Sequence, residues 1–132
     1  AVASYLTMLL QSQAEALRLY QAENGEWHTL ITDPSSYTEA SATAGFGYGI
    51  LKGVRLGLLD RSFLPCGVKA LRAVMNRIDE NGLVQQVSYG TAMGDTLDFY
   101  RRIALSPMPY GQALALLLLC EGSLLESQTK EK

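Results

Sequence analysis

Apolar positions recur along the chain with the period of an α-helix in four separate stretches. They return every three or four residues over 2–22, 39–59 and 64–79, the spacing that gives a helix one apolar face. A fourth stretch, 110–125, contains eight consecutive apolar residues and predicts a helix buried nearly all round. The pattern therefore predicts four helices and an all-α fold.

Turn and capping signals lie between these stretches. Asn-Gly pairs at 24–25 and 81–82 predict the ends of the first and third helices. Residues 36–39, Ser-Tyr-Thr-Glu, fit a capping box, in which the serine and glutamate side chains each bind the other's backbone amide. Residues 83–89 predict a short extended segment, and 90–109 show no sustained period.

The second helical stretch carries glycines at 45, 49, 53 and 57, which share one helix face. Glycine in a helix interior costs about 1 kcal/mol relative to alanine, so this row predicts that another helix packs closely against it. A membrane-helix dimer is the alternative that such a row allows. Lys52 and Arg55 in the same stretch argue against that alternative.

The connections between the predicted helices are long, short and long. Because antiparallel helices alternate in direction, both long connections are expected at the same end, where loops tend to carry function. Many of the residues in these connections have aromatic, hydroxyl or carboxylate side chains, a combination that suits the binding of a sugar. The residues expected there are Trp27, His28, Asp33, Tyr37, Glu39, Ser41, Tyr89, Thr91, Asp95, Asp98, Tyr100, Arg101, Arg102, Ser106 and Tyr110.

Composition narrows the class of protein. With 132 residues, 48% hydrophobic and 18% charged, the chain suits one folded domain. Thirteen acidic and 11 basic residues, for a net charge of −2, leave no basic stripe for nucleic acid or an anionic membrane. No apolar run approaches the roughly 20 residues of a membrane span. Ala1 opens within an amphipathic pattern, so we expect a piece of a longer chain.

Few residues suggest metal or acid–base chemistry on their own. Cys66 and Cys120 lie in predicted helices without metal-ligand spacing and predict two buried thiols rather than a disulfide framework. His28 is the only histidine and is interpreted as a loop residue. Asp95 and Asp98 are expected to be solvated or paired with the arginines that follow them. No metal site is predicted.

Several motifs resemble the C-terminal region of glycoside hydrolase family 105, the unsaturated rhamnogalacturonyl hydrolases, and more loosely family 88. A GxW turn in that family precedes a Y-x-E-x-S segment and a glycine-containing helix that ends KG-x-R-x-G-x-L. The matching positions here are Trp27, Tyr37, Glu39, Ser41, Lys52, Gly53, Arg55 and Gly57. Further similar positions are Gly90, Thr91, Gly94, Asp95, Tyr100, Tyr110, Gly111 and Glu121.

The resemblance implies a fold and an activity. The family adopts an (α/α)6 barrel, a six-hairpin toroid, and residues 1–132 would be the C-terminal portion of that single domain, about its last third. The family removes 4,5-unsaturated galacturonic acid from rhamnogalacturonan (pectin) disaccharides by hydrating the enol-ether double bond. An aspartic acid protonates C4 and assists water attack at C5. No position here matches the motif of that aspartate, so no catalytic residue is assigned and the isolated chain is expected to be inactive.

The resemblance also implies substrate-binding residues and partners. The expected wall of the substrate cleft consists of Trp27, Tyr37, Glu39, Ser41, Thr91 and Tyr110. Two structural alternatives stay open, since Glu39 also suits a helix cap and Trp27 a core position. No cofactor is implied. The expected partners are an unsaturated uronic-acid disaccharide or oligosaccharide and, through apolar faces, the N-terminal remainder of the barrel or a second copy.

The cellular location and the class of protein are the last two expectations from the sequence. Low cysteine content and the lack of a signal sequence favour the cytoplasm. The alternative to part of an enzyme is a non-enzymatic helical module that binds a sugar or a protein through the same loops, because a fold alone does not determine function.

Overall fold

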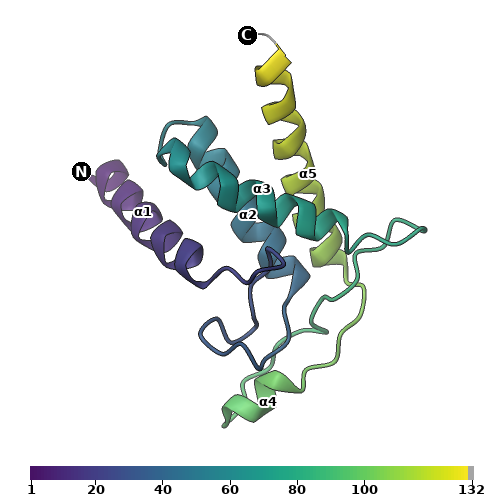
Figure 1. Cartoon of the computed structure of the whole chain (residues 1–132). Coiled ribbons are helices and arrows are strands. Elements are labelled where there is room, and N and C mark those ends of the chain that lie inside the picture. Colours follow the sequence, from purple (N-terminus) through teal and green to yellow (C-terminus); the bar gives the residue numbers. More distant parts are fainter. Residues whose placement is uncertain (131–132) are drawn as a thin grey trace.

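The computed structural model describes residues 1–130 and is built from helices (Figure 1). The elements are α1 (Val2–Tyr20), α2 (Ala40–Arg55), the 3-10 turn η1 (Arg61–Phe63), α3 (Leu64–Met75), α4 (Leu97–Arg101) and α5 (Pro109–Lys130). The described residues contain three isolated antiparallel bridges and no β-strand. The all-α prediction is confirmed. None of the helices in this part of the chain is both long and apolar enough to cross a membrane.

Helices α2, α3 and α5 pack together and form the main core (Figure 1). Each contributes a fully buried apolar side chain, Leu51 from α2, Val74 from α3 and Leu118 from α5. Gly47 lies at the centre of this contact. A Cβ placed there would lie 2.9 Å from the Cβ of Ala70 and 3.2 Å from Leu118. The absence of a side chain at Gly47 therefore lets α2 approach both neighbours closely.

The glycine row proposed from the sequence does not mark this close approach. A Cβ at Gly45 would make only ordinary contact, at 3.7 Å, and one at Gly49 or Gly57 would meet nothing within 4 Å. Gly53 is crowded only by a leucine in the turn that follows α2. The close contacts lie at Gly47 and at Gly67 of α3, whose missing side chain makes room for the side chain of Leu51. The prediction for the row was wrong because four-residue spacing alone does not show which face meets a neighbour.

Three helices end earlier than the apolar period predicts. Helix α1 ends at Tyr20 rather than residue 22, α2 at Arg55 rather than 59, and α3 at Met75 rather than 79. After α2 the chain reverses at Gly57, where φ is +71°, and Leu59 then packs back into the core. Apolar residues beyond a helix end thus prolong the sequence pattern without prolonging the helix. In contrast, α5 continues to Lys130, beyond the predicted residue 125.

The start of α2 differs from the predicted capping box. Glu39 is itself the N-cap residue, with extended φ and ψ of −124° and 119°, and its side chain accepts a hydrogen bond of 2.6 Å from the amide of Ala42. Ser36 instead belongs to a turn, where its hydroxyl donates to the carbonyl oxygen of Asp33 at 2.7 Å. The carboxylate therefore caps the helix as an aspartate would, without a partner serine.

Both long connections lie at the same end of the packed helices, as the sequence predicted (Figure 1). The connection before α2 and the connection between α3 and α5 bind each other directly. The amide of Ala40 donates to the carbonyl oxygen of Gln86 at 2.9 Å, and Arg101 pairs with Asp33 at 2.6 Å. Within the second connection lies α4, five residues long, which is too short to leave a helical period in the sequence.

Apolar side chains remain exposed on two flanks of the described chain. Helix α1 buries Ala14 and Leu17 near its C-terminal end. Its exposed apolar residues are Val2, Tyr5, Leu6, Met8, Leu9, Leu19 and Tyr20. On α5, Leu116, Leu117 and Leu124 are also exposed, so the prediction that this helix is buried nearly all round was wrong for residues 1–130 taken alone.

The two cysteines have different environments. Cys66 is buried in α3, and desolvation by burial raises the pKa of its thiol. Cys120 is exposed on α5, so the prediction of a buried thiol is confirmed for Cys66 and wrong for Cys120. Both are free thiols. Among the described residues, no group of three or more metal-ligating side chains occurs.

Candidate functional site

A cavity of about 500 Å³ lies where the two long connections meet the N-terminal end of α2. Polar groups on its wall come from both connections, from Ser41 of α2 and from Tyr110 of α5, and its apolar part comes from α2, α5 and the first connection. Four of the six predicted site residues, Glu39, Ser41, Thr91 and Tyr110, line this cavity together with His28, Ser88 and the apolar Ile31, Phe46 and Leu114. The structure thus brings side chains that are far apart in the sequence, from His28 to Leu114, together around one opening.

Glu39 holds the cavity wall together. Its side chain is buried, and one carboxylate oxygen accepts from the amide of Ser88 at 2.9 Å. The other accepts from the amide of Ala42 at 2.6 Å. The hydroxyl of Ser41 lies 2.8 Å and 2.9 Å from the two oxygens. These contacts use about all four acceptor positions of a carboxylate, and the positive end of the α2 dipole favours its charge. Glu39 therefore joins the two connections rather than offering a free acid.

Two tyrosines fix the segment around Ser88. The hydroxyl of Tyr110 donates to the carbonyl oxygen of Ser88 and accepts from the amide of Gly90 at 3.0 Å. The hydroxyl of Tyr37 lies 3.0 Å from the hydroxyl of Ser88. Tyr110 is partly exposed at the cavity edge, whereas Tyr37 is not among the lining residues. Of these two predicted site residues, the structure therefore places only Tyr110 on the wall.

Trp27 lies in the core and does not line the cavity. It is fully buried, and its indole nitrogen donates to the carbonyl oxygen of Leu17 at 2.8 Å. Its ring meets the ring of Phe46 edge-on, with centroids 5.4 Å apart. Because Phe46 lines the cavity, Trp27 supports the wall from behind. The structure favours the core interpretation of this residue over sugar stacking.

His28 lies on the cavity wall, and one of its ring nitrogens is engaged within the first connection. Its Nδ1 lies 2.5 Å from the carbonyl oxygen of Ser36, so Nδ1 carries a proton in this contact. In the neutral ring, Nε2 is then an acceptor. The interpretation of His28 as a loop residue was correct. The sequence gave no sign of its contact with Ser36, which lies eight residues away. The two residues meet because the chain folds back at the bridge between His28 and Thr38.

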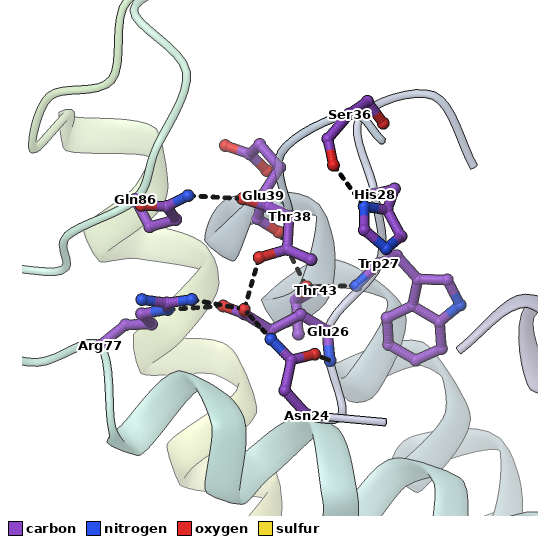
Figure 2. Close-up of polar contacts among 10 residues, drawn as sticks. All are labelled: Asn24, Glu26, Trp27, His28, Ser36, Thr38, Glu39, Thr43, Arg77 and Gln86. Carbon is purple, nitrogen blue, oxygen red and sulfur yellow. Dashed lines mark hydrogen bonds and ion pairs between the residues drawn. The ribbon is translucent and has the colours of Figure 1, made fainter. Parts of the chain in front are cut away.

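A buried ion pair fixes the base of the first connection (Figure 2). Glu26 is 1% exposed and accepts two hydrogen bonds from the guanidinium of Arg77, at 2.7 Å and 2.6 Å. Thr38 and Asn24 donate to the same carboxylate at 2.6 Å and 2.7 Å. Burial raises the pKa of Glu26, but the hydrogen bonds from Arg77 and Thr38 outweigh it, and the net pKa is lowered. Sequence reasoning missed this residue, although it lies inside the GxW turn.

Gln86 redirects the second connection toward Glu39 (Figure 2). It has a φ of +63°, the left-handed region, which is unfavourable for a residue other than glycine. Its side chain donates to the carbonyl oxygen of Thr38 at 3.1 Å, and its own carbonyl accepts from Ala40. The same bend leaves both Val84 and Val87 buried, which breaks the alternation of an extended strand. No sequence signal therefore identified Ser88 as a wall residue.

Three similar proteins support a common origin. A curated relative from Bacillus subtilis (strain 168), "Unsaturated rhamnogalacturonyl hydrolase YesR", is 34% identical over 113 residues, or 85% of this chain and 31% of that protein. A structure from Salmonella enterica serovar Paratyphi A, described as a possible member of family GH105, is 52% identical. It has a TM-score of 0.90 over 92% of this chain and 32% of its own. A Klebsiella pneumoniae structure with the same description is 50% identical, with a TM-score of 0.86 over 89% and 31%.

These matches place the chain within a larger helical fold. It spans about a third of the length of these relatives, and its helices correspond to part of their α/α barrel. The family model described as Glycosyl Hydrolase Family 88 matches residues 2–125, nearly the whole described chain. Together with the related family GH105 structures, this match shows that the chain belongs to Glycosyl Hydrolase Family 88.

Proposed function

We propose that this chain forms about a third of the barrel of a glycoside hydrolase, and that this enzyme removes 4,5-unsaturated galacturonic acid from rhamnogalacturonan disaccharides by hydrating the enol-ether double bond. The observation that carries the proposal is the cavity at the meeting point of the two connections, in a chain 34% identical to a protein named an unsaturated rhamnogalacturonyl hydrolase. Pockets of this kind, with an apolar base and a few fixed polar groups, are the usual form of small-ligand sites.

The role that we propose for this chain is to bind and orient the sugar. The wall offers the hydroxyls of Ser41 and Thr91 and the edge of Tyr110. His28 offers Nε2 as an acceptor for a sugar hydroxyl. Hydrogen bonds hold the side chains of Ser41, Tyr110 and His28 in place, so little ordering of these three is needed when a sugar binds.

The proton donor is proposed to come from the rest of the barrel. Hydration of an enol ether needs a general acid whose proton is available to carbon. Glu39 is the carboxylate on the cavity wall, and its oxygens are already occupied by Ala42, Ser41 and Ser88. Its side chain is therefore already used to hold the wall together, and the bound sugar would have to displace these contacts to reach it. We therefore assign no catalytic residue to residues 1–130.

The proposal includes the partner that covers the exposed flanks. Large exposed apolar patches are rare on isolated proteins, and here they lie on α1 and on the outer face of α5. We propose that the remaining two thirds of the barrel packs against them. We also propose a cytoplasmic location, for which the two free thiols, Cys66 and Cys120, are the supporting observation.

A chimera tests the proposed activity. The chain replaces the matching third of the Salmonella relative, with which it shares 52% identity, and the loss of absorbance of the conjugated double bond is followed with an unsaturated rhamnogalacturonan disaccharide. The Bacillus protein YesR serves as the positive control for the substrate. We expect turnover by the chimera and none by the isolated chain.

Two results would contradict the proposal. The first is a folded chimera that leaves the disaccharide intact while YesR consumes it, since this would favour a different substrate. The second is turnover by the isolated chain, which would show that the acid lies within these residues. Circular dichroism of the chimera and of its Salmonella parent establishes that both are folded.

A further inference from the structure

A second hollow, of about 750 Å³, adjoins the cavity. The two share Gly90 and Thr91 on their walls, so a ligand can pass from one to the other without leaving the surface. The second hollow is formed entirely by the connection between α3 and α5, and its other lining groups include Tyr89, Thr96, Phe99 and Arg102. The proposed function uses none of these four residues.

The loop that forms this hollow is held in one shape. The hydroxyl of Tyr100 accepts from the amide of Gly94 at 3.1 Å, and Thr96 caps α4 by accepting from the amide of Phe99. The ring of Phe99 lies against Gly94, where any Cβ would overlap it. The rings of Phe99 and Tyr100 also meet at nearly a right angle, with centroids 5.3 Å apart. The hollow is therefore a built feature of the loop.

The lining combines aromatic surface, hydroxyls, the cation of Arg102 and the carboxylate of Asp98. The side chain of Tyr89 is 66% exposed and that of Phe99 is 39% exposed. Arg102 is largely exposed and pairs with Asp98 at 2.6 Å through one terminal nitrogen, as the sequence analysis expected. A guanidinium has five N–H donors, so others remain for a ligand. Such donors suit a carboxylate, and exposed aromatic faces suit the apolar face of a sugar.

We propose that this hollow is an additional subsite for an acidic oligosaccharide that extends beyond the disaccharide bound at the cavity. Rhamnogalacturonan alternates galacturonate, which carries a carboxylate, with rhamnose, which carries a methyl group. The carboxylate fits Arg102, and the methyl group and ring fit Tyr89 and Phe99. The inference rests on the proposed function, because it takes the cavity as the site of the first two sugars.

The test compares two probes on the isotope-labelled chain in which Leu6 and Leu9 are replaced by lysine, so that the exposed flank of α1 does not drive self-association. An unsaturated rhamnogalacturonan disaccharide and the corresponding tetrasaccharide are titrated while backbone amide shifts are followed by NMR. We expect the disaccharide to shift amides of the cavity, such as Ser41 and Ser88. The tetrasaccharide is expected to shift these and, in addition, Thr96 and Arg102. We also expect the tetrasaccharide to bind about three- to tenfold more tightly, the range that one aromatic contact supplies.

Variants separate the subsite from the cavity. Tyr89→Ala and Arg102→Gln are expected to remove the advantage of the tetrasaccharide and leave disaccharide affinity unchanged. Met93→Ala is the matched control, since Met93 belongs to the same loop, is 95% exposed and does not line the hollow. It is expected to change neither affinity.

Each other outcome overturns the inference. Equal affinities for the two probes, with cavity shifts present, would remove the second subsite and leave the proposed function intact. An equal loss in Met93→Ala would show that the loop acts as a whole. No cavity shift with either probe would count against both the subsite and the proposed role of the cavity.

Discussion

Asp33 and Arg101 form an ion pair at 2.6 Å between Oδ2 and Nη2, although they are 68 positions apart in the sequence. Asp33 belongs to the connection before α2, and Arg101 ends α4 in the connection before α5. The pair therefore joins the two segments that border the cavity. Hydrogen bonds from Ser35 and from Arg101 lower the pKa of Asp33 from 3.8 to about 2.

This pKa predicts a specific loss of stability in acid. Because the folded pKa is below the unfolded value, the ionised Asp33 carboxylate, bound by Ser35 and Arg101, stabilises the fold above about pH 4, and this contribution is lost as the pH falls from 3.8 toward about 2. Asp33→Asn removes the titrating group. We expect the Tm of the wild type to fall more between pH 5 and pH 2.5 than that of the variant. Parallel falls in the two proteins would rule out this role for the pair.

The buried pair between Glu26 and Arg77 should matter more than a surface pair. Arg77→Ala leaves the carboxylate of Glu26 buried without its cation, and we expect a loss of about 3 kcal/mol in unfolding free energy. Glu15→Ala removes an exposed pair with Arg18 and should cost less than about 1 kcal/mol. Urea unfolding of both variants provides the comparison. Equal costs would mean that Glu26 is solvated rather than buried.

Two glycines of α2 should respond oppositely to the same substitution. Gly47→Ala places a Cβ 2.9 Å from Ala70, and we expect it to destabilise the fold by about 1–3 kcal/mol through overpacking. Gly49→Ala meets nothing within 4 Å, and should stabilise it by up to about 1 kcal/mol because alanine favours the helix. Chemical unfolding measures both. A stabilising Gly47→Ala would contradict the observed packing of α2.

The exposed flank of α1 predicts association of the isolated chain. Leu6 and Leu9 are 57% and 45% exposed in the N-terminal half of α1, so we expect the isolated chain to self-associate in light scattering until a partner covers them. Replacing both with lysine should shift the population toward monomer. A wild-type chain that stays monomeric at high concentration would argue against the uncovered flank.

Helical periods and connection lengths were sufficient for much of the fold. They predicted the four longer helices and the common end at which Glu39, Thr91 and Tyr110 meet. They did not give the details that depend on contacts distant in sequence. The sequence around Glu39 is compatible with two roles, the last residue of a capping box and the N-cap residue itself. The hydrogen bond that its carboxylate accepts from the amide of Ser88 is visible only in the structure.

Other features had no sequence signal or a misleading one. The left-handed conformation of Gln86 occurs at a residue type that rarely adopts it. Apolar spacing predicted burial of Cys120, whose thiol is exposed on α5. Trp27 matched a family motif and was expected on the cleft wall, but it is buried, with its indole nitrogen bonded to the carbonyl oxygen of Leu17. For Gln86 and Trp27, the deciding partner lies ten or more residues away in the sequence.

The most direct test of the central claim is the specificity constant of the chimera for the unsaturated disaccharide after removal of one wall hydroxyl. Thr91→Ala is compared with Thr7→Ala, whose hydroxyl bonds to the carbonyl oxygen of Ala3 on α1. We predict that Thr91→Ala lowers kcat/KM by about two- to tenfold, the value of one hydrogen bond, and that Thr7→Ala leaves it unchanged. Full activity in a folded Thr91→Ala chimera would contradict the claim that this cavity binds the sugar.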